Sequence, residues 1–269
     1  MVPTLAHAAT SPVLGAADSF TVLSGTYSNT SPGSTINGDL GYTTPPVFPP
    51  TVNGSTHVAD ATYNQAGIDQ GTALSALNSQ PCTFTFAPGA VDLASDTTHG
   101  AAGSYAPGVY CISGAASIGG GATLTLTGAG TYIFRMTGAL TSTANSIVTV
   151  AGGGSACNVF WTPGAATTLG ANSTFGGTII DASGVTIGNT VLWTGRALAF
   201  GGTVSTDNDT LSSSACSAKT NQAVSAAKTP GLPNTGESQP RHAAFSQGLI
   251  LFGVFTSCLV LARIVFKRA

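Results

Sequence analysis

The sequence predicts a mainly β protein with one α-helix, and three observations support this prediction. Apolar and polar residues alternate with a period of two, as in "TLTLT" at 123–127, which is typical of half-buried strands. Pairs and triplets of glycine recur between such segments and suit tight corners between short strands. Within the main domain, only residues 54–81 form a long segment of helical character, and a second, transmembrane helix is expected at residues 243–266. The alternation fits a sandwich, a barrel or a β-solenoid, and no fixed repeat length selects among them.

The first residues resemble the end of a secretory signal peptide. Ala6-His7-Ala8 has the small-x-small pattern that signal peptidase recognises, although the apolar region before it is short. We therefore interpret residues 1–9 as the remnant of a signal peptide whose natural start lies upstream. Residues 10–216 are then the main domain.

The single helix is expected at about residues 55–79. Ser55 or Thr56 could cap its N-terminus, and Pro81 prevents it from extending further. The apolar stripe that would face the core consists of Val58, Ala61, Ile68, Ala73, Ala76 and Leu77.

The chain after Pro81 is predicted to form short strands separated by glycine-rich turns. In "LAFGGTVST", alternation places Leu198, Phe200 and Val204 on one side. Applied to every such segment, alternation gives an outward set of small polar residues: Thr123, Thr125, Thr127, Thr168, Asn172, Thr174, Thr178, Thr186, Thr190, Thr203 and Ser205. The phrase "TSTAN" adds Thr141 and Thr143 as candidates.

Charged residues are scarce, at 7% of the chain against about 25% in typical proteins. Before residue 219 the only basic residues are Arg135 and Arg196, which we expect to pair with aspartates. The acids there are nine aspartates, so the formal charge is 2 − 9 = −7. A surface so poor in cations cannot neutralise a phosphate backbone, which argues against nucleic-acid binding.

The sequence does not indicate an enzyme, a metal site or a cofactor. Asp207 and Asp209 are the only close pair of carboxylates, and they are better explained as part of a turn or closing strand. Neither His57 nor His99 has a nucleophile motif beside it.

Four cysteines belong to the main domain, and a fifth, Cys258, lies in the C-terminal apolar segment. Four cysteines allow three pairings, and disulfides are expected if the protein is exported. We predict the pairs Cys82–Cys111 and Cys157–Cys216.

The C-terminal region indicates attachment to a bacterial cell wall. Residues 217–231 have the small, polar composition of a flexible stalk. The LPxTG sorting signal follows as Leu232, Pro233, Asn234, Thr235 and Gly236. Residues 243–266 are long and apolar enough to span a membrane, and the tail 267–269 is basic. The expected partners are thus the membrane, then a sortase that joins Thr235 to peptidoglycan, which would leave the protein secreted and wall-anchored.

A set of phrases over residues 13–211 carries a family resemblance. They include "LGAADSFTVLSGTYSNT", "INGDLGY", "APGVYCISGAAS", "GAGTYIFRM", "TLGANSTFGGTII" and "TGRALAFGGTVS". In this order they resemble the ice-binding-protein-like family of cold-adapted bacteria, fungi and algae. The resemblance implies an irregular right-handed β-solenoid of triangular section with one long helix alongside. It also implies binding of ice through one flat face, without an active site or a metal.

A threonine-rich strand surface is physically suited to ice. The threonine hydroxyl can join an ordered water layer, its methyl group is weakly hydrated, and its β-branch keeps χ1 stiff. The candidate ice-binding residues are Thr168, Asn172, Thr174, Thr178, Thr186, Thr190, Thr123, Thr125, Thr141 and Thr143. Alternation alone does not say which of them share a face. The alternative function is a wall-anchored adhesin, or a general surface-binding module, on the same scaffold.

Overall fold

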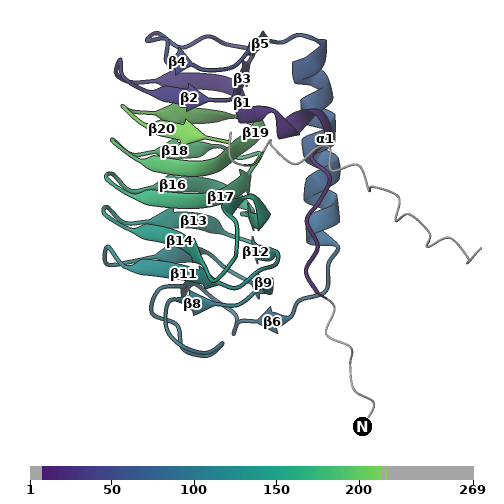
Figure 1. The fold of residues 1–269 in the computed structure, drawn as a ribbon, viewed down its shortest axis with the longest axis vertical. Coiled ribbons are helices and arrows are strands. Elements are labelled where there is room, and N and C mark those ends of the chain that lie inside the picture. Colours follow the sequence, from purple (N-terminus) through teal and green to yellow (C-terminus); the bar gives the residue numbers. More distant parts are fainter. Residues whose placement is uncertain (1–7, 214–215, 217–269) are drawn as a thin grey trace, which may run out of the picture. The chain divides into compact units, whose positions relative to one another are not determined.

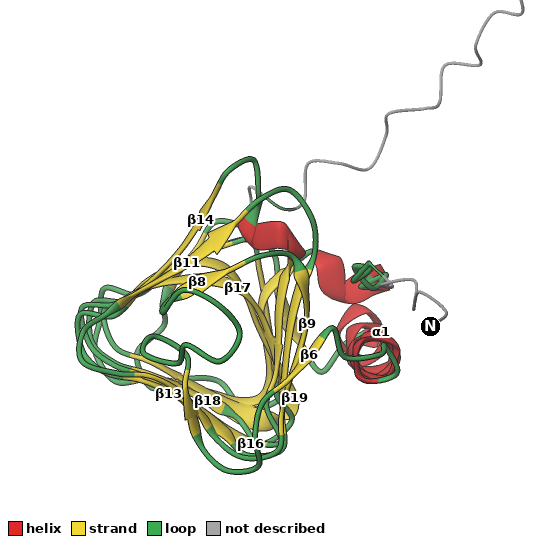
Figure 2. Cartoon of the chain, turned by 90° about the horizontal axis from the view of Figure 1, so that it is seen from below, coloured by secondary structure: helices red, strands yellow, loops and turns green. Residues whose placement is uncertain are grey.

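The computed structural model describes residues 8–213 and 216. Short parallel strands stack into a column, and one α-helix, α1 (Ala61–Asn78), runs along it (Figure 1). Seen along the column, the section is triangular and α1 lies outside one of the three sides (Figure 2). The predicted mainly β fold with one helix alongside is therefore confirmed.

Each coil of the column visits three faces in the same order, and we number the faces in that order. Face 1, the face beside α1, comprises β6 (Phe84–Thr85), β9 (Gly108–Ile112), β12 (Tyr132–Met136), β15 (Val159–Thr162), the end of β17 (Thr174–Ile180), the middle of β19 (Leu192–Thr206), the start of β1 (Phe20–Asn29), β3 (Asp39–Tyr42) and β5 (Thr56–Val58). Two short 3-10 helices, η1 (Gly15–Asp18) and η2 (Ala156–Asn158), lie outside the faces.

In the described part of the chain, no α-helix covers either of the other two faces (Figure 2). Face 2 comprises β7 (Val91–Asp92), β10 (Ala116–Ile118), β13 (Ala139–Ser142), β16 (Ala165–Leu169), β18 (Val185–Ile187) and the ends of β19 and β1. Face 3 comprises β8 (Ser104–Tyr105), β11 (Thr123–Thr127), β14 (Ile147–Ala151), the starts of β17 and β19, β20 (Thr210–Ser212), β2 (Thr35–Asn37) and β4 (Thr51–Val52).

The order of coils in space differs from their order in the chain. The first coil, β1 and β2, pairs in parallel with the last coil, β19 and β20. The strands β3 to β5 then complete one end of the column, and α1 returns the chain to the other end, where β6 begins (Figure 1). We call the junction of β1 with β19 and of β2 with β20 the seam. It joins residues that are far apart in sequence.

The helix begins later than predicted and buries a different stripe. Residues Thr56–Val58 form strand β5, so neither Ser55 nor Thr56 is the cap. Asp60 caps the helix instead, because its side chain accepts a hydrogen bond from the Tyr63 amide. The buried residues are Tyr63, Ala66, Gln70, Ala73 and Leu77, so the predicted stripe was right only for Ala73 and Leu77.

The orientation of the helix explains why most of the predicted buried residues were wrong. Gly67 lies directly against the Phe200 ring, so the helix approaches face 1 along the line through Tyr63 and Gln70. Ile68 is turned away from this line and is 64% exposed. Val58 belongs to β5 and is exposed as well.

Most strands of face 1 are buried on both sides, one in the column interior and the other under α1, whereas β5 and β6 at its two ends are partly exposed. Leu198 belongs to the cluster beneath the helix, whereas Val204 belongs to the interior cluster. The prediction that Leu198, Phe200 and Val204 share a side was therefore wrong. The sides exchange near Gly201, whose φ of 87° takes the chain around the corner from face 1 to face 2.

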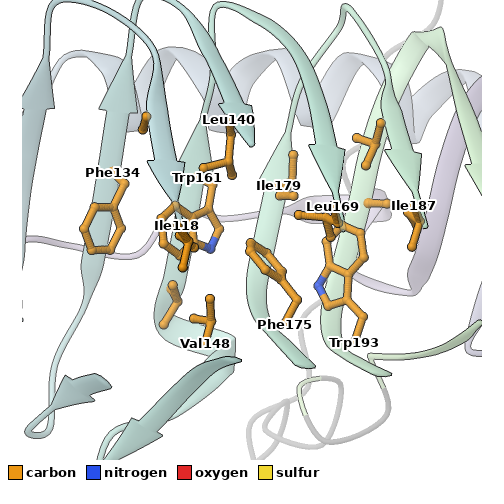
Figure 3. Packing of buried hydrophobic residues seen from close by; sticks show 14 of the residues in the cluster. Ile118, Phe134, Leu140, Val148, Trp161, Leu169, Phe175, Ile179, Ile187 and Trp193 are labelled. Atoms are coloured by element: carbon orange, nitrogen blue, oxygen red, sulfur yellow. The ribbon is translucent and has the colours of Figure 1, made fainter. Parts of the chain in front are cut away.

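Aromatic rings from successive coils pack on one another inside the column (Figure 3). The rings of Phe134 and Trp161 are stacked with centroids 4.3 Å apart, and Phe175 lies between Trp161 and Trp193 at 5.4 and 5.2 Å. Each indole also donates a hydrogen bond to the backbone: Trp161 to the carbonyl of Gly176 and Trp193 to that of Gly177. These contacts hold neighbouring coils at a fixed height and register.

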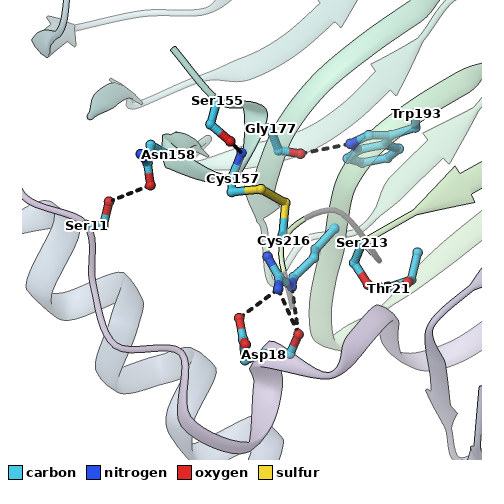
Figure 4. Close-up of a disulfide and its surroundings, with 11 residues drawn as sticks. Ser11, Asp18, Thr21, Ser155, Cys157, Asn158, Gly177, Trp193, Ser213 and Cys216 are labelled. Carbon is cyan, nitrogen blue, oxygen red and sulfur yellow. Dashed lines mark hydrogen bonds and ion pairs between the residues drawn. A yellow bond between two sulfur atoms is a disulfide. The ribbon is translucent and has the colours of Figure 1, made fainter. Parts of the chain in front are cut away.

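Both predicted disulfides are confirmed. Cys82–Cys111 joins the segment after α1 to β9, and Cys157–Cys216 joins η2 to the chain just after the last strand (Figure 4). They close the chain on itself at two points of the column.

The two arginines have different partners. Arg196 forms an ion pair of 2.7 Å with Asp18, as expected. Arg135 donates instead to the backbone carbonyls of Asn78 and Gln80, so the expectation that it pairs with an aspartate was wrong. It satisfies carbonyl groups at the C-terminal end of α1, which have no partner within the helix.

Several predictions concern residues outside the described ones. These are most of the signal remnant 1–9, the stalk 217–231, the sorting signal 232–236, the segment 243–266 with Cys258, and the tail 267–269. Within residues 8–213 and 216, no helix is both long and apolar enough to cross a membrane.

The aromatic stack predicts that Trp161→Ala will destabilise the domain by about 3–5 kcal/mol, because it opens a cavity between Phe134 and Phe175. Urea unfolding followed by tryptophan fluorescence would measure this loss. Ile68→Ala, at an exposed helix position, is the control and should change stability by less than about 0.5 kcal/mol. Equal losses in the two variants would contradict the assigned role of the stack.

Candidate functional site

The candidate residues predicted from the sequence lie on all three faces and in one corner between two of them. Thr123, Thr125 and Thr174 are on face 3, whereas Thr141, Thr168 and Thr186 are on face 2. Thr143, Asn172 and Thr190 lie in the corner between these faces. Thr178 is on face 1. The predicted set therefore does not form one surface.

Thr178 is the clearest error in the predicted set. It is fully buried on face 1, paired in register with Phe160 and Arg196, and its hydroxyl has no partner among the described residues. The phrase "TLGANSTFGGT" was treated as one alternating strand, but it crosses two corners. One is at Asn172, with φ 56°, and the other is at Gly177, with φ 113°.

The corner between faces 2 and 3 is built from a recurring left-handed residue. Asn145, Asn172, Thr190 and Asn208 all have φ between 56° and 64°. Polar side chains bond along this corner from coil to coil, as the Thr190 hydroxyl does to the Asn172 side-chain oxygen at 2.5 Å. Thr143 likewise accepts a bond from the Gly121 amide at 2.9 Å. Thr143, Asn172 and Thr190 thus contribute to the corner more than to a flat face.

Face 3 carries two columns of outward residues that are in register across the coils. The first column is Thr123, Ile147, Thr174, Leu192, Thr210, Thr35 and Thr51. The second column has two parts, Ser104, Thr125 and Thr149 on one side and Thr194, Ser212 and Asn37 on the other, and the buried Gly176 lies between them. Thr127 extends the face beside them. No charged residue occurs in either column.

Two large apolar side chains project from face 3 into solvent. Ile147 is 39% exposed and Leu192 is 57% exposed, and Thr174 lies between them in the first column. Neither residue was predicted to be outward, because hydropathy places apolar residues in the interior. The spacing from the corner could have identified them. The first outward residue of each strand comes two positions after the left-handed corner residue, as Ile147 comes after Asn145 and Thr174 after Asn172.

Face 2 has a different chemical character. Its outward column is Asp92, Ser117, Thr141, Thr168, Thr186, Ser205 and Ser28. The residues beside this column include Ala139 and Ala166, so the column stands alone on a surface of small side chains. Face 2 contains a carboxylate and no exposed large apolar residue, in contrast to face 3.

The carboxylates near face 3 have structural roles. Asp209 is buried in the corner, where its side chain accepts hydrogen bonds from the amides of Val191 and Asp207 at 2.7 and 2.8 Å. Burial raises the pKa of Asp209 from its ordinary 3.8 to about 6. A hydrogen bond from the Ser31 hydroxyl lowers the pKa of Asp207. Among the described residues, no group of histidine, cysteine or acidic side chains could hold a metal ion.

Comparison with known proteins identifies relatives of the whole domain. The model of the ice-binding-like family matches residues 21–212. An ice-binding protein of Nostoc sp. (strain HG1) is 35% identical over 226 residues, which cover 80% of this chain and 79% of the relative.

Solved structures of ice-binding proteins are also similar. That of the Antarctic ascomycete Antarctomyces psychrotrophicus has a TM-score of 0.66 and 28% identity, covering 76% of this chain and 98% of the relative. That of an Antarctic Flavobacteriaceae bacterium has a TM-score of 0.64 and 29% identity, covering 76% of this chain and 47% of the relative.

The buried Asp209 carboxyl predicts that the domain becomes more stable on mild acidification. Because the folded-state pKa lies above the unfolded value, the folded state binds more protons between about pH 4 and 6. Stability contributed by Asp209 should therefore fall by about 2–3 kcal/mol as pH rises through this window, and stay constant above it.

Urea unfolding of the wild type and of Asp209→Asn at several pH values would test this prediction. Burial also raises the pKa of Asp181, so the variant should keep a smaller dependence of the same sign. A variant with the same pH dependence as the wild type would show that Asp209 does not titrate in this window.

Proposed function

The chain belongs to the ice-binding-like family, and we propose that it binds ice crystals through face 3. The relatives in Nostoc and in Antarctomyces psychrotrophicus are both named ice-binding proteins. Three sides of the column are available in principle, but α1 covers face 1. The choice therefore lies between faces 2 and 3.

The exposed Ile147 and Leu192 within an uncharged column of threonines favour face 3 over face 2. Charged side chains bind water strongly, and this water must be displaced before a crystal can approach. Methyl and methylene groups hold water weakly, while the threonine hydroxyls still supply hydrogen bonds. The water above a surface with both properties can take up the order of the water in a crystal face.

The β-stack makes this surface rigid and regular. Residues two apart on a strand are about 6.6–6.8 Å apart, and neighbouring strands are about 4.7–4.9 Å apart, so the two columns form a two-dimensional grid. The backbone ladder and the stiff χ1 of threonine leave little entropy to be lost on binding. Ice binding makes and breaks no covalent bond, so the proposed function requires neither a catalytic residue nor a cofactor.

We also propose that the protein acts at the cell surface. The support is the sequence 232–236, which has the LPxTG form and precedes the apolar segment 243–266 and the basic tail. A sortase would join Thr235 to peptidoglycan, and face 3 would then hold ice close to the cell. A freely secreted protein would act at a distance instead.

Thr174→Tyr should reduce ice-binding activity about tenfold, because a ring projecting between Ile147 and Leu192 breaks the flat surface and removes about 1.4 kcal/mol of binding. The melting temperature should change little, since Thr174 is exposed. Inhibition of ice recrystallisation by purified residues 8–216 would measure the effect. The Antarctomyces relative, matched over 98% of its length, consists of little more than this domain.

Thr168→Tyr, at an exposed position on face 2, is the matched control and should leave the activity intact. Loss of activity in Thr168→Tyr alone would move the site to face 2. A folded wild-type domain that allows crystals to coarsen like an inert protein would argue against ice binding and favour the adhesin alternative.

Thr235→Ala should prevent anchoring, because the sortase joins the wall to this threonine. Cell fractionation should then show the protein displaced from the wall fraction into the membrane fraction and the medium. Thr229→Ala, in the stalk, is the control and should leave the protein in the wall. Wall attachment that survives Thr235→Ala would contradict the proposed anchor.

A further inference from the structure

Face 3 is assembled from two distant parts of the chain. Residues 104–212 supply its rows from Ser104 up to Thr210, and residues 35–52 supply the rows beyond the seam. Within the first part, short turns connect successive coils and fix their register. Across the seam no such connection exists, because the bonded residues Ser34 and Asp209 are 175 positions apart.

A buried polar network occupies this seam, just behind face 3. The Asp209 side chain accepts a hydrogen bond from the Val191 amide on the coil of β17 to β19. Its own amide donates to the Ser34 hydroxyl at 3.2 Å, on the first coil. The Ser34 hydroxyl in turn donates to the Asn29 side-chain oxygen at 2.8 Å. Asp209 thus bonds to one neighbouring coil through its side chain and to the other through its backbone amide.

Further hydroxyl groups complete the network. Thr206 donates to the same Asn29 oxygen at 3.0 Å and bonds to the Tyr27 hydroxyl at 2.7 Å. Asn29, Ser34, Thr206 and Asp209 are each 3% exposed or less. The Asn29 side-chain nitrogen has no hydrogen-bond partner among the described residues. Buried polar groups are costly unless paired, so the bonds that the network does make favour one relative position of the two coils.

The equivalent position in the other coils has no carboxylate. The residue that follows the left-handed corner residue, and precedes the outward residue of the first column, is Ala122, Ser146, Ser173 or Val191 in those coils. Asp209 and Ser34 hold this position on the two sides of the seam, directly before Thr210 and Thr35. A shift of one residue there would turn Thr35 inward, because side chains alternate between the two sides of a strand.

We propose that the Asp209 side chain is a positioning group: its bonds to the amides of Val191 and Asp207 fix the place of the Asp209 backbone amide, which donates to Ser34 across the seam. This keeps the N-terminal rows of face 3 in register with the C-terminal rows, so that both parts form one ice-binding surface. This inference rests on the proposed function of face 3. It assigns a role in binding to a side chain that does not touch the ligand.

The test compares variants in which the seam and the surface are changed separately. Asp209→Ser, which introduces the residue type of the other coils, removes the bond to Val191. Thr51→Tyr alters the surface beyond the seam, and Thr123→Tyr alters it at the far end of the C-terminal part. Ice-recrystallisation inhibition is measured on the full chain, well below the melting temperature of each variant.

If Asp209 positions the surface, Asp209→Ser alone lowers the activity several-fold while the protein remains folded. Thr51→Tyr then causes no further loss in that background, whereas Thr123→Tyr still does. A purely structural role predicts full activity of folded Asp209→Ser and equal effects of Thr51→Tyr in both backgrounds, and this result would overturn the proposal. Ser173→Ala, at the same position away from the seam, is the control and should leave activity unchanged.

Amide hydrogen exchange tests the seam without using ice. Asp209→Ser should accelerate exchange at Thr35–Asn37 and Thr210–Ser212 about tenfold and leave Thr123–Thr127 unchanged, because local opening is confined to the seam. Equal acceleration of all three strands would overturn the proposal. If Asp209→Ser does not fold, Ser34→Ala is measured in the same way, because it removes the hydroxyl that accepts the bond from the Asp209 amide across the seam. A wild-type protein without ice activity would refute the proposed function, while the exchange data would still report on the seam.

Discussion

The packing of side chains inside the column determines where every outward residue lies. Phe134, Trp161, Phe175 and Trp193 contact one another from coil to coil, and the two indoles bond to the backbone of Gly176 and Gly177. Once these rings point inward, the alternation of side chains along each strand fixes which residues point outward. Leu124 and Leu126 point inward, so Thr123, Thr125 and Thr127 point outward. The packing of the interior therefore determines which residues form the candidate binding surface.

The corners decide which outward residues share a face. Between faces 2 and 3, a left-handed residue is followed by a buried residue and then by the first outward residue of face 3. Asparagine recurs at the left-handed position because its short polar side chain tolerates positive φ and bonds locally. Since this corner has the same length in each coil, Thr123, Ile147 and Thr174 fall in one column. A corner longer by one residue would displace a whole row.

Sequence patterns predicted well which residues of a single strand point outward, but predicted poorly which residues of different strands share a face. "TLTLT" is one strand, and its three threonines are on one face as expected. Thr178 was wrong because two corners separate it from Thr168, and a positive φ at Asn172 is not visible as an interruption of alternation. The helix stripe was wrong because contact with Phe200 at Gly67, a long-range fact, sets the helix orientation. The disulfides were right, while Ile147 and Leu192 were missed because hydropathy alone assigns such residues to a core.

An uncharged, partly apolar face creates a risk of self-association, and the charge distribution counters it. None of the nine aspartates before residue 219 belongs to the two columns of face 3. Asp39 and Asp60 lie near one end of the column, and Asp92 and Asp96 lie near the other. Negative charge therefore lies at both ends of the column and is absent from the two columns of face 3. Two molecules that approach face to face bring these charges together and repel each other, whereas a neutral crystal surface is not repelled. Charge at the ends of the column thus opposes self-association through face 3 and leaves the proposed binding surface uncharged.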